Sequence, residues 1–142
     1  MGLSLTCGIY SKDYISFDIG YIGFTQFRIA LAEAYNKELG ELYKRWIFGS
    51  IPYMPEYKEL SEEELARLNE LSGDLGYLLG HSDIEGNLLP SESRKLYKAL
   101  ENVKCDYTTN KGYHGQEELN VLEELKKMFF YSWKKRRRII FS

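Results

Sequence analysis

A twelve-residue segment that begins at His81 contains the residue types in this chain whose spacing most suggests chemistry. Asp83 stands at position 3, Glu85 at position 5 and Glu92 at position 12, where a calcium-binding helix–loop–helix places oxygen ligands, and Gly86 stands at its turn. Position 1, normally Asp, is His81, and an imidazole suits zinc or manganese better than calcium. If this segment holds a metal ion, its ligands are therefore Asp83, Glu85 and Glu92, with the metal left open.

The same segment allows two interpretations without a metal. In the first, Ser82 and Asp83 cap local backbone amides and the loop is structural. In the second, His81, Ser82 and Asp83 face a pocket and contact a ligand. His114 is the only other histidine, which excludes a metal site built from many histidines.

The start of the first long helical pattern is a second candidate. Gly20 and Gly23 stand three residues apart before this pattern, and Arg28 is expected in about its first turn. A cation there opposes the helix dipole, but it suits a place where free N–H groups also meet an anion. One hypothesis is an anion contact made by the Gly23 N–H, Arg28 and Tyr21. The other is an ordinary surface arginine.

A run of five basic residues, 134–138, is the third candidate. Compensation of a helix dipole together with solvation is a sufficient explanation for such a run at a helix end. The alternative is an anion site that includes Arg136 and Arg137. Nucleic acid is disfavoured as a partner, and a duplex-binding patch in particular, because the rest of the chain is acidic and the formal net charge is −2.

Periodicity around these candidates predicts strands and helices in one domain, residues 1–142. Strands are expected at residues 3–7 and 14–19, as a hairpin, and at 139–141, paired with one of the first two. A first helical stretch is expected at residues 24–46, with a break at Gly40 or at 36–37. A second helix is expected after a capping box at 61–64, a third at 91–102 and a last one from Gln116 onward. Residues 49–58 and 105–115 are expected to be an extended connection and a loop. Trp46 and Leu65 are placed on core-facing stripes, and Asp74 is expected to cap a short helix.

Composition limits the class of protein. A chain of 142 residues with 12 Tyr, 7 Phe and 2 Trp is typical of a folded domain. Cys7 and Cys105 are expected as free thiols of a reducing compartment, and no apolar run reaches the roughly 20 residues of a spanning helix. A cytoplasmic protein without membrane contact is therefore expected. The known nucleotide, hydrolase and metalloprotease motifs are absent, which favours a non-enzymatic role without a cofactor.

Three short motifs suggest a family: G-x-x-G-F-x-x-F-R at residues 20–28, H-S-D-x-x-G at 81–86, and a last helix that ends in an apolar strand at 129–141. With these motifs the chain resembles a family of short, mostly uncharacterised bacterial and phage proteins. That family often has a cysteine where this chain has Ile84, so the resemblance supports no reactive cysteine here. It implies a phage or prophage accessory protein of the host cytosol, with no settled activity.

Taken together, these patterns predict an α+β fold. A small antiparallel sheet from both chain ends packs on four or five helices, with an EF-hand-like helix–loop–helix in the middle. The leading functional hypothesis is an anti-defence protein that sequesters a small anionic ligand of nucleotide type. One alternative is an interaction module that inhibits a host protein through residues 51–57 and the basic end; another is an EF-hand-like metal-binding protein. Self-association is left open.

Overall fold

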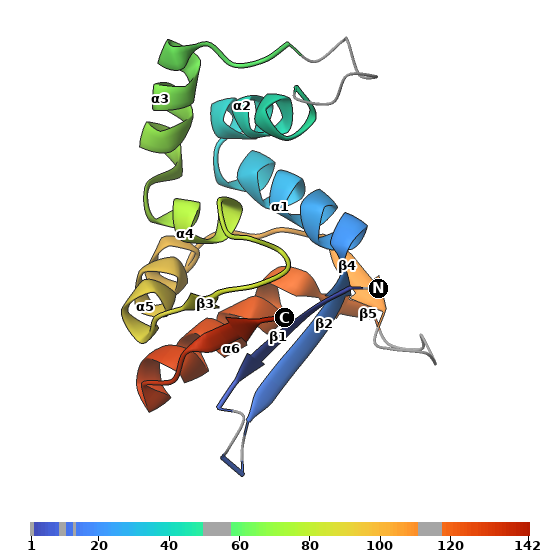
Figure 1. Ribbon diagram of the computed structural model, residues 1–142, viewed down its shortest axis with the longest axis vertical. Helices are drawn as coiled ribbons and strands as arrows, with labels where there is room; N and C mark the ends of the chain where they lie inside the picture. Colours follow the sequence, from blue (N-terminus) through green and yellow to red (C-terminus); the bar gives the residue numbers. More distant parts are fainter. Residues whose placement is uncertain (1, 9–10, 13, 50–57, 111–117) are drawn as a thin grey trace.

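Both ends of the chain lie in one antiparallel sheet (Figure 1). The structure is a computed structural model that describes residues 2–8, 11–12, 14–49, 58–110 and 118–142. The strands of the sheet, in spatial order, are β2 (Ile15–Gly20), β1 (Gly2–Cys7), β6 (Ile139–Phe141) and β3 (Asn87–Leu88). A separate two-stranded ladder joins β4 (Thr108–Asn110) to β5 (Glu118–Asn120).

Alternation along the strands decides which face of the sheet is buried. In β1, Leu3 and Leu5 are buried and stand opposite Ile19 and Phe17 of β2. On its other side Leu5 stands opposite Phe141 of β6, which is also buried. One face of the sheet is therefore apolar and packs on the core, as is common for antiparallel sheets.

The C-terminal strand β6 is central in the sheet, since it pairs with β1 on one side and with β3 on the other. Beyond its last pair the ladder continues, because Ser4 N donates to the Ser142 carbonyl oxygen at 2.8 Å and Ser142 N donates back at 2.9 Å. The prediction that both chain ends build the sheet is confirmed.

The helices complete the α+β fold that the sequence predicts. Five of them have ten residues or more: α1 (Tyr21–Tyr35), α2 (Lys37–Phe48), α3 (Glu62–Ser72), α5 (Pro90–Ala99) and α6 (Val121–Lys135). Two short elements, the 3-10 turn η1 (Gly73–Leu75) and the one-turn helix α4 (Gly76–Leu79), lie between α3 and the loop that begins at His81. Within the described residues, no helix has the length and apolar character needed to cross a membrane.

Side-chain caps mark the starts of α2 and α3. The long helical pattern breaks at Asn36, whose side chain accepts a hydrogen bond from Leu39 N at 3.0 Å and caps α2. The predicted capping box is present at α3, with Ser61 and Glu64 each accepting from the other's backbone N–H. Glu64 also forms an ion pair with Arg45 of α2, and this guanidinium lowers the pKa of Glu64 to about 2. These contacts hold α3 beside α2.

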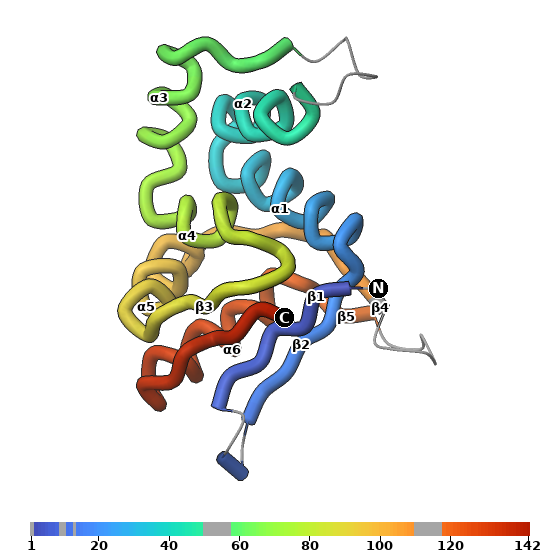
Figure 2. The backbone as a smooth tube through the Cα atoms, viewed as in Figure 1, coloured from blue at the N-terminus to red at the C-terminus, as the bar shows by residue number. Residues whose placement is uncertain are grey.

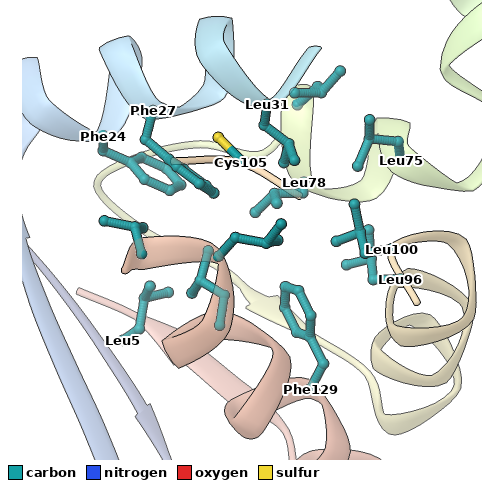
Figure 3. Close-up of a cluster of buried hydrophobic side chains, with 14 of the residues drawn as sticks. Leu5, Phe24, Phe27, Leu31, Leu75, Leu78, Leu96, Leu100, Cys105 and Phe129 are labelled. Atoms are coloured by element: carbon teal, nitrogen blue, oxygen red, sulfur yellow. The ribbon is translucent and has the colours of Figure 1, made fainter. Parts of the chain in front are cut away.

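The core lies where α1, α5 and α6 meet over the apolar face of the sheet. Figure 2 shows α1 leaving the sheet directly after β2, with α2 and α3 beyond it, and α5 beside α6. Figure 3 shows side chains from these elements converging, among them Phe27 of α1, Leu96 of α5 and Phe129 of α6. All three are at most 1% exposed, so the helices and the sheet share one core.

Two expected core positions are wrong. Trp46 is 43% exposed and Leu65 is 41% exposed, although both continue the apolar stripes of their helices. Their rings and methyl groups instead line a hollow of about 410 Å³ beside α2 and α3. The expected cap at Asp74 is also wrong, because α4 has Leu75 at its N-cap and no side-chain cap.

The segment before the last long helix differs from the prediction in one further way. Residues 108–110 and 118–120 pair as β4 and β5, where a loop and the start of a helix were expected. Helix α6 therefore begins at Val121, with Asn120 as its cap through a 3.0 Å bond from Glu123 N. The extended connection expected at residues 49–58 lies largely outside the described residues.

The shared core gives a stability prediction. Leu78→Ala should lower the free energy of unfolding by about 2–5 kcal/mol, because it removes a fully buried side chain and leaves a cavity. Chemical denaturation monitored by circular dichroism measures this. The control is Ile84→Ala, at a position 60% exposed, which should change stability by about 0.5 kcal/mol or less. Equal effects of the two variants would contradict the assignment of the core.

Candidate anion-binding site

Arg28 is a buried residue, not the first-turn residue that the sequence suggests. Helix α1 begins at Tyr21, so Arg28 lies two turns inside it and is only 6% exposed. Its guanidinium lies 4.5 Å from the centroid of the Phe24 ring. An arginine in this position needs polar partners in the protein, because its charge is removed from water.

Those partners are backbone carbonyl groups at the end of α4. Arg28 Nη1 donates to the carbonyl oxygen of His81 at 2.7 Å. It also donates to the carbonyl oxygens of Leu79 at 3.3 Å and Leu78 at 3.5 Å. The Tyr43 hydroxyl donates to the same Leu79 oxygen at 2.9 Å, and burial raises the pKa of this hydroxyl to about 12. A cation here satisfies carbonyl groups that a helix end leaves without partners. The structure thus brings Arg28 and His81 together, but through the backbone of His81.

The His81 ring fastens the loop to the sheet. It stacks on Phe141 of β6 with 3.7 Å between ring centroids, and its nitrogens lie 2.7 Å from the Ser82 oxygen and 3.0 Å from the Asn87 oxygen. Gly86 makes the turn at φ +100°, where a side chain would also press on the His81 ring. The imidazole therefore contacts backbone oxygens within its own loop.

The remaining polar residues of the loop also have local contacts. Ser82 Oγ accepts from Ile84 N at 3.2 Å, and Glu92 Oε1 accepts from Leu89 N at 2.8 Å at the start of α5. Asp83 is half-buried, and its carboxylate adds to burial in raising the pKa of Tyr43. In the described part of the chain, no three His, Cys, Asp or Glu side chains are grouped to hold a metal ion. The helix–loop–helix is present, and its contacts favour the structural interpretation.

This geometry predicts the response to metals. The melting temperature should not change with millimolar calcium, zinc or manganese, because Glu92 already caps α5 and does not close the loop around an ion. Thermal scanning of chelator-treated protein measures this. A rise that depends on metal concentration and disappears in Asp83→Asn would contradict it.

Tyr21 and Gly23 lie in the first turn of α1, about two turns and one and a half turns before Arg28 on the same helix. Tyr21 is half-buried and packs against the core, and a side chain at Gly23 would contact Ile19 and the Tyr107 hydroxyl. The Arg28 guanidinium binds the end of α4, and among the described residues no hydrogen bond joins it to Tyr21 or Gly23. The guanidinium is thus directed at the end of α4, and a joint anion contact with Tyr21 and Gly23 stays a prediction.

A different set of cations converges on one aromatic ring at the α5–α6 surface. Lys134 Nζ lies 3.9 Å from the Trp133 ring centroid, Lys98 Nζ lies 5.3 Å from it, and Arg94 Cζ lies 5.8 Å from it. Within the described residues these three cations form no ion pair. Three like charges beside one ring repel each other, so a bound anion would stabilise the arrangement.

Two more aromatic rings lie beside Trp133. The ring centroids of Tyr97 on α5 and Phe130 on α6 are 5.4 Å apart. These two centroids lie 6.0 and 6.1 Å, respectively, from the Trp133 ring centroid, and the rings are tilted or edge-to-face. Phe130 is 43% exposed. We call this surface the basic–aromatic site, and its residues are Arg94, Tyr97, Lys98, Phe130, Trp133 and Lys134.

A hollow of about 390 Å³ borders the basic–aromatic site. Tyr97 and Phe130 form part of its wall. The other lining residues come from α6 and the end of α5: Glu101, Glu123, Lys126 and Lys127. The hollow thus combines aromatic surface with carboxylates and ammonium groups, a composition suited to a polar, flat ligand.

Buried polar contacts fix the basic turn that follows α6. Ser132 Oγ donates to the Arg137 oxygen at 2.5 Å, and Ser93 Oγ donates to Ser132 Oγ at 2.8 Å. Cys7 Sγ donates to the same Arg137 oxygen at 3.6 Å, and burial raises the pKa of this thiol to about 11. Arg136 takes the left-handed conformation at φ 55° to end the helix. The side chains of Arg136 and Arg137 remain exposed beside the site.

The charge of the chain is strongly divided along its length. Residues 90–142 contain 12 Lys and Arg against 7 Asp and Glu, whereas residues 1–89 contain 7 against 14. The net charge of −2 therefore conceals a basic segment that includes α5 and α6. An anion approaching this part meets a positive surface despite the acidic remainder.

No protein-family model, curated protein or solved structure was found to match this chain. The resemblance to a phage family therefore stays a prediction from three short motifs.

Sequence inspection missed the part of the site on α5. Arg94 and Lys98 stand four residues apart, with Tyr97 between them, so all three lie on one helical face. Phe130, Trp133 and Lys134 repeat this spacing on α6. Two basic–aromatic helical faces were therefore visible, but nothing in the sequence showed that they meet.

The role of Arg28 gives a prediction about stability. Arg28→Met should lower the free energy of unfolding by about 1.5–3 kcal/mol, because the carbonyl groups of Leu79 and His81 lose a charged donor. The control is Arg138→Met, which removes an equal charge from an exposed position. Urea denaturation of both variants measures the difference. A loss no greater than that of the control would contradict the structural role.

Proposed function

We propose that the protein is a non-enzymatic binding protein that takes a small anionic, nucleotide-like ligand at the basic–aromatic site. The observation that carries this proposal is the convergence of Lys134, Lys98 and Arg94 on the half-exposed Trp133 ring. The cations supply contacts for phosphate oxygens, and the neighbouring rings supply flat surfaces for a base. Arg136 and Arg137 extend the same positive surface beyond the end of α6.

The state of the thiols supports a non-enzymatic role. Burial raises the pKa of Cys7 to about 11 and also raises the pKa of Cys105, so both remain protonated near neutral pH. A cysteine nucleophile needs the thiolate form. Neither residue therefore fits covalent catalysis, in agreement with the lack of catalytic motifs in the sequence.

In this proposal the loop around His81 has a supporting role. Arg28 and His81 hold the loop between α4 and the sheet, while the ligand binds at the α5–α6 surface. Ligand contact by Tyr21, Gly23, Ser82 or Asp83 stays a prediction. Sequestration of a host-defence signal, the leading functional hypothesis from the sequence, also stays a prediction.

A second candidate is a protein-interaction module. The specific observation in its favour is the hollow of about 410 Å³ near α2 and α3, where Trp46 and Leu65 expose apolar surface. The expected contact segment, residues 51–57, lies outside the described residues. A partner retained by Lys98→Gln/Lys134→Gln but lost in Trp46→Ala would favour this candidate.

Calorimetry with a nucleoside triphosphate tests the leading proposal. The double variant Lys98→Gln/Lys134→Gln should raise Kd by about tenfold or more, because two charge-assisted contacts to phosphate are lost. The matched control is Lys37→Gln/Lys58→Gln, which removes the same charge from exposed positions at the start of α2 and before α3. No heat for the wild-type protein, or equal weakening in both double variants, would overturn the proposal.

A further inference from the structure

The basic–aromatic site and the hollow that borders it are together longer than one nucleotide. Lys127, which pairs with Glu124 at 3.2 Å, lines the hollow, and Lys134 beside Trp133 follows it seven positions later, about 10 Å along the helix at 1.5 Å per residue. Stacked nucleotides rise about 3.4 Å each along a strand, so this length corresponds to about three nucleotides. The exposed Arg136 and Arg137 extend the cationic surface further.

We infer that the ligand of this site is single-stranded nucleic acid, an inference that rests on the proposed function. A phosphate lies among Arg94, Lys98 and Lys134. The exposed ring of Phe130 stacks on one base, and the hollow beside Tyr97 receives a neighbouring base. Proteins that bind single strands without sequence specificity combine these two contacts: cations bind the phosphate backbone and aromatic rings stack on the bases.

Two carboxylates favour unpaired bases over a duplex. Glu101 and Glu123 line the hollow, and Glu123 pairs with Lys126 at 3.7 Å, so Glu101 is the carboxylate that chiefly repels the phosphates of a duplex there. Unpaired bases instead offer N–H donors on their Watson–Crick edges, which a carboxylate accepts. In a duplex these edges are occupied by pairing, and the base faces are covered by stacking. The site therefore favours a single strand.

The same carboxylates argue against an anionic membrane. A bilayer surface of anionic lipid would be repelled by Glu101 and Glu123 on the face that would have to approach it. The rings also pack against one another, with Phe130 edge-to-face on Trp133, rather than standing free for insertion among lipid chains.

The test is fluorescence anisotropy with labelled twelve-nucleotide RNA and DNA strands, the matching duplexes and mononucleotide competitors. We expect the single strands to bind at least about tenfold more tightly than the duplexes or a mononucleotide. Phe130→Leu should weaken single-strand binding about fivefold or more, because it keeps apolar volume but removes the stacking surface. Phe130→Tyr should retain binding, and Trp46→Ala, at an equally exposed aromatic position elsewhere, should not change it.

Each other outcome has a distinct meaning. Mononucleotide binding without gain from strand length would overturn this inference and leave the proposed function standing, whereas no binding of either would overturn both. Inorganic polyphosphate that binds as tightly as the strands, together with unchanged affinity in Phe130→Leu, would overturn base stacking. Binding to phosphatidylserine vesicles in place of oligonucleotides would assign the surface to membranes and also overturn the inference.

Discussion

The buried guanidinium of Arg28 is the contact on which the placement of the loop between α4 and the sheet depends. It lies inside α1, which follows the N-terminal hairpin directly, and it binds the carbonyl oxygens where α4 ends and the loop begins. A charge in this environment is tolerated only because those oxygens replace water. Without it the His81 oxygen would lose its charged donor, whereas the Leu79 oxygen would keep the Tyr43 hydroxyl. One side chain thus satisfies the end of a helix and fixes the start of the loop that delivers β3 to the sheet.

The second constraint is the insertion of β6 between β1 and β3. The strand follows the turn at Arg136 immediately, so the position of the basic turn is set by the sheet on one side and by α6 on the other. The hydrogen bonds among Ser93, Ser132 and the Arg137 backbone connect this turn to α5. The surface cations of the basic–aromatic site are therefore carried by elements that the core already holds in place.

Local patterns predicted the elements well. Alternation identified the hairpin and the last strand, and the capping box at Ser61 identified the start of α3, because these signals depend on neighbours in sequence. The functional assignments depended on distant partners. Arg28 and His81 do meet, but periodicity could not show that the guanidinium faces the end of α4. The exposure of Trp46 could not be predicted for the same reason. An apolar stripe on a helix does not show how far the neighbouring helix that packs against it extends. The contact between Arg94 and Trp133 forms only because α5 packs against α6, and no local spacing of residues predicts that packing.

The division of charge along the chain has a consequence at long range. The acidic first turn of α3 and the basic end of α6 lie toward opposite ends of the molecule in Figure 1. Such a separation of charge gives the molecule an electric dipole that the net charge of −2 does not reveal. A nearby negative body would exert a torque as well as a force on it and would turn the α5–α6 surface toward itself. Orientation of this kind raises the rate of productive encounters in dilute salt. The rate gain decreases as the Debye length shortens toward about 8 Å at physiological ionic strength.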